Sequence, residues 1–128
     1  MIVVDTHVLL WRWGNPAKLS KSAARALEKS DTVLVPAIVC WEICLLTRLG
    51  RVQLQRPVLE WLHAILDLDD YALANLTPEV ADVGAAISTK TLADPADRMV
   101  VATAMLNQCP LVTADGSIHD SGLVQCIW

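Results

Sequence analysis

The chain has 128 residues, of which 54% are hydrophobic and 19% are charged, and its formal net charge is −4. This length suits a single domain with its own hydrophobic core, so we expect residues 1–128 to form one domain. The longest nearly apolar stretch, residues 33–46, contains Pro36 and Glu42 and falls short of the roughly 18 residues that span a bilayer, which excludes a transmembrane helix. So apolar a composition also suggests that a partner covers part of the surface.

The cysteines and the N-terminal segment favour a cytoplasmic location. Cys40, Cys44, Cys109 and Cys126 show no Cys-x-x-Cys spacing, so we expect four reduced, buried thiols rather than a disulfide or a zinc site. No basic region precedes the short N-terminal apolar run, so no secretory signal is expected.

Charge is distributed unevenly along the chain. The negative total argues against simple electrostatic binding to nucleic acid, but the basic residues are clustered. Eight of the ten lysines and arginines lie within the first 56 residues: Arg12, Lys18, Lys21, Arg25, Lys29, Arg48, Arg51 and Arg56. This pattern predicts one basic flank, and ordinary solvated helix faces are the alternative.

The first predicted element is a strand over residues 2–5, because this run is continuously apolar and rich in β-branched residues, as in buried parallel strands. Residues 7–13 predict a short helix or turn that ends at Gly14. Ser20 can cap a helix that continues to about residue 29.

The middle of the chain predicts a strand and two helices. Residues 32–35 predict the second strand, and Pro36 suits the start of a helix over about residues 37–49. A second helix is expected over residues 57–66, with Leu59, Leu62, Ile65 and Leu66 on its inner side.

The last third continues the alternation of strands and helices. A third strand is predicted over residues 71–76, followed by helices over residues 77–88 and 94–107. A fourth strand is predicted over residues 111–113, and residues 123–127 suit a fifth strand at an edge. Strands that alternate with helices indicate an α/β sandwich around a mostly parallel sheet.

Four carboxylates lie inside or at the ends of segments that should be buried: Asp5, Glu42, Asp97 and Asp115. Burying an unpaired carboxylate costs so much free energy that buried charges are normally paired or bound to a metal. Only Arg98 lies directly beside one of the four. Several acids without matching basic residues suit a hard divalent cation, so the pattern indicates a metal site.

The predicted fold would bring these acids together. Ligands of such sheets bind at the carboxyl ends of the strands. Asp5 ends the first predicted strand and Asp115 follows the fourth. Glu42 lies on the helix after the second strand, and Asp97 lies in the first turn of the helix before the fourth, so all four can meet at one edge.

Each acid also has a purely structural interpretation. Asp5 could cap the following helix, Glu42 could be a partly exposed helix residue, and Asp115 could belong to a plain turn. Asp94 and Asp97 fit the N-cap and N3 positions of a helix start, and for Asp94 capping is the favoured interpretation. Each signal is weak alone, but all the structural interpretations would have to hold at once.

Five segments carry motifs in a fixed order along the chain. They are residues 3–11 (VVDTHVLLW), 36–43 (PAIVCWEI), 48–52 (RLGRV), 94–98 (DPADR) and 111–115 (LVTAD). In this order and spacing they resemble PIN-domain ribonucleases, specifically VapC-type toxins of bacterial toxin–antitoxin pairs, over essentially the whole chain. The resemblance implies a PIN-like three-layer sandwich whose central, mostly parallel sheet of four to five strands is flanked by helices.

The resemblance also implies an activity, metal-dependent hydrolysis of RNA phosphodiester bonds with Mg²⁺ or Mn²⁺ as the cofactor. Asp5, Glu42, Asp97 and Asp115 are the predicted catalytic residues. We assign Asp5, Asp97 and Asp115 as metal ligands, and Glu42 as a ligand or as a base that orients water.

Four further residues are predicted to assist: Asp94, Thr6, Thr113 and Arg98. Asp94 is an auxiliary ligand or, preferably, only the helix cap. The two threonines would hydrogen-bond the acids or a phosphate, with ordinary turn bonding as the alternative. Arg98 would neutralise Asp94 or reach RNA, with a surface ion pair as the alternative.

The sequence favours packing roles for His7 and for the tryptophans. We expect His7 to be a packed or hydrogen-bonded helix residue, since activating a metal-bound water needs no histidine. Trp11, Trp13, Trp41 and Trp61 could stack on bases, but their helical spacing among leucines favours packing in the core or at an interface.

The chain departs from the family pattern in two places. Gly116 stands where the family often has Arg or Lys after the last Asp, which puts substrate or partner contacts near the site in doubt. Cys40 and Cys44 stand where small residues are common. Neither departure removes a carboxylate.

The implied partners are an RNA substrate, a cognate antitoxin protein and a second copy of the chain in a homodimer, without a membrane. VapC-like proteins are silenced by an antitoxin whose C-terminal segment covers apolar helices near the active site. The high apolar content fits such a covered surface.

A receiver domain and a non-catalytic PIN-like domain are the two alternative classes of protein. A receiver domain would need a neighbouring pair of acids after its first strand and a lysine after a late strand, but Thr6 and His7 follow Asp5, and no lysine follows Lys90. A non-catalytic PIN-like domain that binds RNA or protein remains the alternative, although all four acids are present.

Overall fold

The computed structural model describes all 128 residues and contains a five-stranded sheet in which every strand pairing is parallel. The strands are β1 (Ile2–Val4), β2 (Val33–Pro36), β3 (Tyr71–Ala74), β4 (Leu111–Val112) and β5 (Cys126–Ile127). Their order in the sheet is β3-β2-β1-β4-β5, so β1 is central. The predicted α/β fold is confirmed, and the sheet is wholly rather than mostly parallel.

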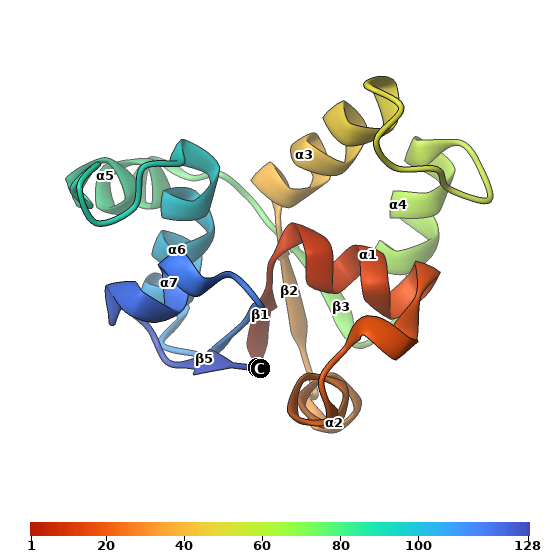
Figure 1. Ribbon diagram of the computed structural model, residues 1–128, viewed down its shortest axis with the longest axis horizontal. Helices are drawn as coiled ribbons and strands as arrows, with labels where there is room; N and C mark the ends of the chain where they lie inside the picture. Colours follow the sequence, from red (N-terminus) through yellow and green to blue (C-terminus); the bar gives the residue numbers. More distant parts are fainter.

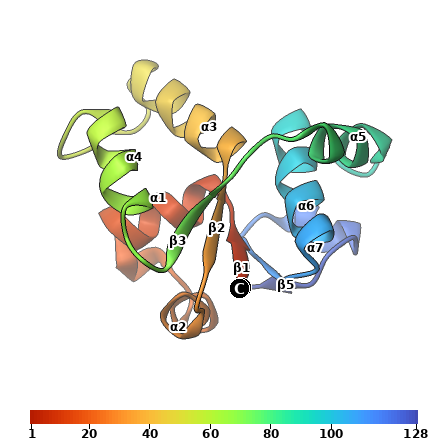
Figure 2. The ribbon, with the colours of Figure 1, turned by 180° about the vertical axis from the view of Figure 1, so that it is seen from behind.

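Seven α-helices flank this sheet. They are α1 (Thr6–Gly14), α2 (Lys21–Lys29), α3 (Ala37–Arg48), α4 (Val58–Leu66), α5 (Pro78–Ala86), α6 (Pro95–Asn107) and α7 (Gly116–Ser121). Figure 1 shows α1 to α4 on the side of β2 and β3, and α5 to α7 on the side of β5. Figure 2 shows the same division from behind, with β1 and β2 between the two groups of helices.

Two short elements were not predicted, and four strands are shorter than expected. β1 and β4 each end one residue early. A 3-10 turn, η1 (Pro16–Lys18), follows α1, and α7 begins directly after Asp115. β3 ends at Ala74, and β5 contains only the two residues that pair with β4. The length of a strand depends on how many of its residues can form backbone hydrogen bonds with the neighbouring strand, and the local sequence does not reveal this.

The core lies between the sheet and the helices. Val3 and Val4 of β1 are fully buried, as are Val39 and Ile43 of α3. Burying such an aliphatic side chain contributes about 1.5–3 kcal/mol relative to leaving it exposed. The core therefore fixes α3, which packs against α1, α4, α6 and the end of β2.

The inner side of α4 differs from the prediction. Leu62 and Ile65 are buried as expected, but Leu59 is 63% exposed and Trp61 is buried in its place. Several helical faces of residues 58–66 are apolar, so the sequence pattern could not decide which one would face the core.

The predicted helix boundaries are largely confirmed. The Ser20 hydroxyl accepts a hydrogen bond from Ala23 N at 3.0 Å and caps α2. Gly50, with φ of 71°, follows α3 in the left-handed conformation that glycine adopts without strain. All four cysteines are free thiols, as expected, but each is only partly buried because it lies at the edge of the core. None of the helices has the length and apolar character needed to cross a membrane.

Candidate active site

Five carboxylates line one pocket of about 400 Å³, which we call the acidic pocket. They are Asp5, Glu42, Asp94, Asp97 and Asp115. The other lining residues are Thr6, His7, Trp11, Val100 and Ala114. No lysine or arginine lines this pocket, so its negative charge has no permanent cation beside it.

The parallel sheet brings these acids together. Asp5 directly follows β1, and Asp115 lies shortly after β4, which is paired with β1. Parallel neighbours end at the same edge of a sheet, so the two acids meet although 110 residues separate them in sequence. Glu42 reaches this edge from α3, which follows β2, and Asp97 reaches it from the first turn of α6.

Hydrogen bonds hold Asp5 in place. Its Oδ1 accepts from Val8 N at 2.9 Å, so Asp5 is the N-cap of α1. Its Oδ2 accepts from the hydroxyl of Thr113. Burial raises the pKa of Asp5, and these two hydrogen bonds partly oppose the rise because they stabilise the charged form.

Thr113 connects two of the acids. Its side chain is fully buried, donates to Asp5, and accepts a hydrogen bond from Asp115 N at 3.0 Å. His119 lies on the other side, with Nε2 2.7 Å from the carbonyl oxygen of Thr113. The short segment between β4 and α7 is therefore fixed by side chains as well as by backbone.

Thr6 orients Glu42. The buried Thr6 hydroxyl donates to Glu42 Oε1 at 3.0 Å and links the start of α1 to α3. Burial raises the pKa of Glu42, the hydrogen bond from Thr6 lowers it, and the nearby Asp94 raises it again. One carboxylate oxygen is thus held, which leaves Oε2 able to accept a proton.

The pKa of Asp97 is strongly raised in the site. Burial raises its pKa to about 7, and repulsion from Asp94, Asp115, Glu42 and Asp5 contributes in the same direction. No cation is among the main causes of this rise, whereas the nearby His7 lowers the pKa values of Asp5 and Glu42. A carboxyl group that is hard to ionise beside four others is typical of a site that binds a cation.

Asp94 and Asp115 also cap helices. Asp94 Oδ1 accepts from Ala96 N at 2.8 Å at the start of α6, which is the predicted capping role. Asp115 Oδ1 accepts from Ile118 N at 3.1 Å and caps α7, so it does not lie in a plain turn. Both nevertheless line the acidic pocket, so capping and a role in the site are compatible.

Arg98 is placed differently from the sequence-based interpretations. Its guanidinium donates to the backbone oxygens of Leu92 at 2.9 Å and Ala93 at 3.3 Å. It does not line the acidic pocket. Arg98 therefore braces the loop before α6 and does not neutralise Asp94.

His7 is placed differently from the prediction, whereas among the tryptophans the predicted core packing is confirmed for Trp61. His7 is exposed and lines the acidic pocket together with Trp11. Trp13 is 42% exposed and Trp41 is 56% exposed, whereas Trp61 is buried. The sequence did contain a sign that His7 lies at the site, because it follows Asp5 by two residues. The first residues of a helix that begins at a site lie close to that site.

The donor set of the acidic pocket fits Mg²⁺ or Mn²⁺. No three acidic, histidine or cysteine side chains lie close enough together to form a ready-made metal cage. Mg²⁺ does not need one, because it is usually held by one or two carboxylates and keeps several waters. The oxygen-only acids and the volume of the pocket suit such a partly hydrated cation.

Replacing Thr113 by Val is expected to lower the free energy of unfolding by about 1–3 kcal/mol, because Asp115 N and Asp5 would lose a buried partner. Urea unfolding measures this loss. Thr103→Val is the matched control, since the buried Thr103 hydroxyl donates only to the carbonyl of Met99 in its own helix. Equal losses in the two variants would contradict the bridging role of Thr113.

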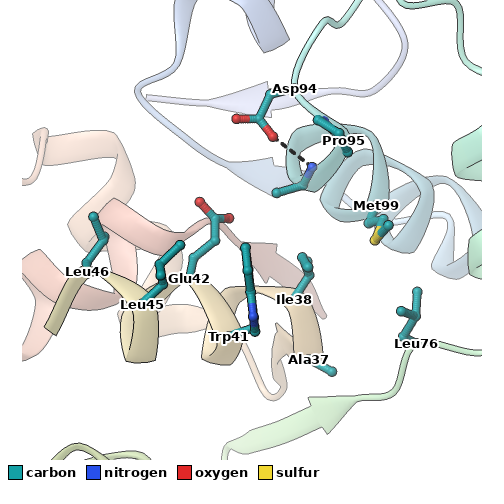
Figure 3. A pocket seen from close by; sticks show the side chains of 11 residues that line it. Ala37, Ile38, Trp41, Glu42, Leu45, Leu46, Leu76, Asp94, Pro95 and Met99 are labelled. Carbon is teal, nitrogen blue, oxygen red and sulfur yellow. Dashed lines mark hydrogen bonds between the residues drawn. The ribbon is translucent and has the colours of Figure 1, made fainter. Parts of the chain in front are cut away.

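A second and larger pocket adjoins the acidic one. We call it the apolar groove; its volume is about 640 Å³. Its lining residues are Ala37, Ile38, Trp41, Glu42, Leu45, Leu46, Leu76, Asp94, Pro95, Ala96 and Met99. Figure 3 shows the α3 side chains on one side, Pro95 and Met99 of α6 on the other, and Glu42 and Asp94 toward the same end. These two acids line both pockets, so the groove leads into the acidic pocket.

Comparisons with known proteins agree with this arrangement. The model of the PIN domain family matches residues 2–121. Ribonuclease VapC22 of Mycobacterium tuberculosis is 36% identical over 114 residues, which cover 89% of this chain and 86% of that protein.

Solved structures share the fold. VapBC2 from Rickettsia felis, bound to a DNA fragment from its promoter, has a TM-score of 0.71 at 14% identity and covers 98% of this chain and 97% of the other. FitAcB from Neisseria gonorrhoeae has a TM-score of 0.65 at 24% identity and covers 98% of this chain and 96% of the other.

Proposed function

We propose that this chain, which belongs to the PIN-domain family and within it to the VapC-type ribonuclease toxins, hydrolyses phosphodiester bonds of RNA with Mg²⁺ or Mn²⁺ as its cofactor. The observation that carries the proposal is the convergence of Asp5, Glu42, Asp97 and Asp115 on one pocket without a basic residue. Asp5, Asp97 and Asp115 would hold the cation, directly or through water.

The residues divide the work of hydrolysis. A bound divalent cation supplies positive charge and polarises the scissile phosphate. Glu42, held through one oxygen by Thr6, orients the attacking water and accepts its proton as the bond to phosphorus forms. Thr113 and Val8 N keep Asp5 aimed into the pocket while the bond to the leaving oxygen breaks.

The raised pKa of Asp97 also supports a cation. Without one, burial and the repulsion of the neighbouring carboxylates raise the pKa of Asp97 to about 7. A divalent ion would stabilise the ionised form and lower that pKa. Asp97 would then be charged at neutral pH, as a ligand must be.

The exposed side chains of the apolar groove support the proposal that a protein partner binds there. We propose that a cognate antitoxin inhibits the enzyme in the cytoplasm and that the toxin forms a homodimer. Trp41 and Leu45 are exposed beside Glu42, so a partner that covers them would also reach the mouth of the acidic pocket. A toxin–antitoxin complex from Klebsiella pneumoniae shares the fold with a TM-score of 0.62 at 18% identity, and the free cysteines suit a reducing compartment.

Purified, antitoxin-free protein is expected to cut total cellular RNA into discrete products in Mg²⁺ or Mn²⁺ and to leave it intact in EDTA. Heat-treated protein and a mock purification control for contaminating nuclease. Intact RNA under every metal condition, from a folded sample, would favour the alternative of a PIN-like binding domain. Light scattering of the same sample tests the homodimer, and a monomer at all concentrations would contradict it.

A further inference from the structure

An aromatic cluster lies beside the acidic pocket and has no role in the chemistry described so far. The ring centroids of His7 and Trp11 are 5.6 Å apart, and those of Trp11 and Trp128 are 5.5 Å apart. Both pairs are tilted by 48°. Lys18 Nζ lies 6.0 Å from the ring centroid of Trp11, which is within the range of a cation–π contact.

Trp11 is not part of the hydrophobic core. On the same helix Val8, Leu9 and Leu10 are buried, whereas Trp11 is half-buried and His7 is exposed. His7 and Trp11 are four residues apart and share one face of α1, which lines the acidic pocket. The helix therefore has a packed side and an aromatic side that faces the site.

An RNA substrate needs a contact that the acidic pocket does not provide. The pocket has five carboxylates and no lysine or arginine, so it repels the phosphates on either side of the scissile one. Stacking on an aromatic ring binds a base without involving charge, and every base has a face that can stack. Lys18, whose Nζ lies over the ring of Trp11 on a flexible side chain, is a cation that can contact a neighbouring phosphate.

We infer that Trp11, with His7 beside it, is a stacking platform for an unpaired RNA base next to the cleaved bond, and that Lys18 binds an adjacent phosphate. The inference rests on the proposed ribonuclease function and assigns to that site a residue that binds a base of the substrate. Trp11 contacts substrate but not the reacting atoms, so it is a binding residue.

Binding is measured apart from cleavage. A short, mixed-sequence, fluorescein-labelled RNA strand is titrated with protein in Mg²⁺, and fluorescence anisotropy is recorded. Every protein in this assay carries Asp97→Asn, so that the RNA stays intact. In this background Trp11→Leu and Trp11→Met are expected to bind about five- to 100-fold more weakly than the parent.

Two controls separate stacking from packing. Trp11→Phe keeps an aromatic face, and we expect it to bind within about threefold of the parent. Trp13→Leu changes a tryptophan two residues away that packs edge-on against Tyr71 at 5.8 Å and does not line the pocket, so its affinity should be unchanged. Circular dichroism confirms that each variant is folded, and either Leu or Met at position 11 suffices as the ring-free variant.

Salt dependence tests the role of Lys18. Lys18→Gln is expected to reduce the slope of log affinity against log salt by about 0.7, the loss of one phosphate contact on a single strand. Trp11→Leu should weaken binding at every salt concentration without changing this slope. A slope unchanged in Lys18→Gln would remove Lys18 from the platform.

Cleavage kinetics provide a second readout. In the protein with Asp97 intact, Trp11→Leu should raise KM by a factor similar to its loss of affinity and leave kcat nearly unchanged. If the parent cleaves RNA but Trp11→Leu matches it in affinity and KM, or if Trp11→Phe loses as much as Trp11→Leu, the platform is wrong and the nuclease stands. If the parent does not cleave RNA under any metal condition, the nuclease proposal fails, and the platform inference fails with it.

Discussion

Replacing Asp97 by Asn is expected to slow metal-dependent RNA cleavage by at least about 100-fold. Mutating a residue that only hydrogen-bonds a metal ligand already reduces activity by about 10- to 100-fold, and Asp97 is expected to be a ligand itself. The amide has nearly the same shape but cannot supply the negative charge that holds the cation. Gel analysis of RNA products measures the loss. Asp82→Asn is the control, because it removes the same charge from an exposed position on α5 outside the acidic pocket.

The same variant should be more stable than the parent at neutral pH without metal. Because the pKa of Asp97 is about 7 in the folded protein and 3.8 when unperturbed, the folded state binds more protons between these values. The free energy of unfolding therefore falls as pH rises from about 4 to 7 and levels off above that range. Asp97 is half-buried and partly screened, so we expect its replacement to recover about 1–2 kcal/mol at neutral pH.

Urea unfolding in EDTA at a series of pH values measures this effect. The parent should lose stability over the range more steeply than Asp97→Asn, although Asp5 and Glu42, whose pKa values are also raised, leave some slope in both. Adding Mg²⁺ should stabilise the parent more than the variant. Undiminished cleavage by Asp97→Asn, or parallel pH profiles, would remove Asp97 from the site.

Replacing Ile43 by Ala is expected to lower the free energy of unfolding by about 2–5 kcal/mol. Ile43 is fully buried on α3, directly after Glu42, and its truncation leaves a cavity in the hydrophobic core. The free energy of unfolding of a typical domain is only about 5–15 kcal/mol, so the variant is expected to be only marginally stable.

Leu45→Ala is the matched control for Ile43→Ala. Leu45 lies on the same helix but is 38% exposed in the apolar groove, so its truncation should cost less than about 1 kcal/mol. Urea unfolding is compared at one protein concentration, because dimer formation would add to the stability. Similar losses in the two variants would mean that α3 is not anchored through Ile43.

Regular patterns in the sequence predicted most of the architecture. The run of β-branched residues before Asp5 marked β1, and Ser20 and Asp94 marked the starts of two helices, because capping and strand formation depend on neighbouring residues. The order of strands and helices implied a parallel sheet, and this implied that Asp5 and Asp115 would meet. Their presence in one pocket with Glu42 and Asp97 follows from that topology.

Properties that depend on distant parts of the chain were not predictable in this way. Asp115 caps a helix that was not predicted, and Arg98 binds backbone oxygens rather than an acid. Trp61 is buried while Trp13 and Trp41 are exposed, although all three lie on apolar helices. Which face of a helix is buried depends on its neighbours in space. Several faces of these helices are apolar enough to pack against the core, so the sequence did not identify the buried one.

The sequence by itself determined the fold class, the family and the acids that belong to the site, because periodicity, capping residues and ordered motifs are local properties of the chain. Only the tertiary structure decided how those acids are held and what surrounds them. Thr113 reaches Asp5 across 108 residues, Thr6 reaches Glu42 across 36, and α1 turns His7 and Trp11 toward the pocket. Such contacts form only when the sheet aligns its strand ends, because no local pattern specifies which distant side chain will be adjacent.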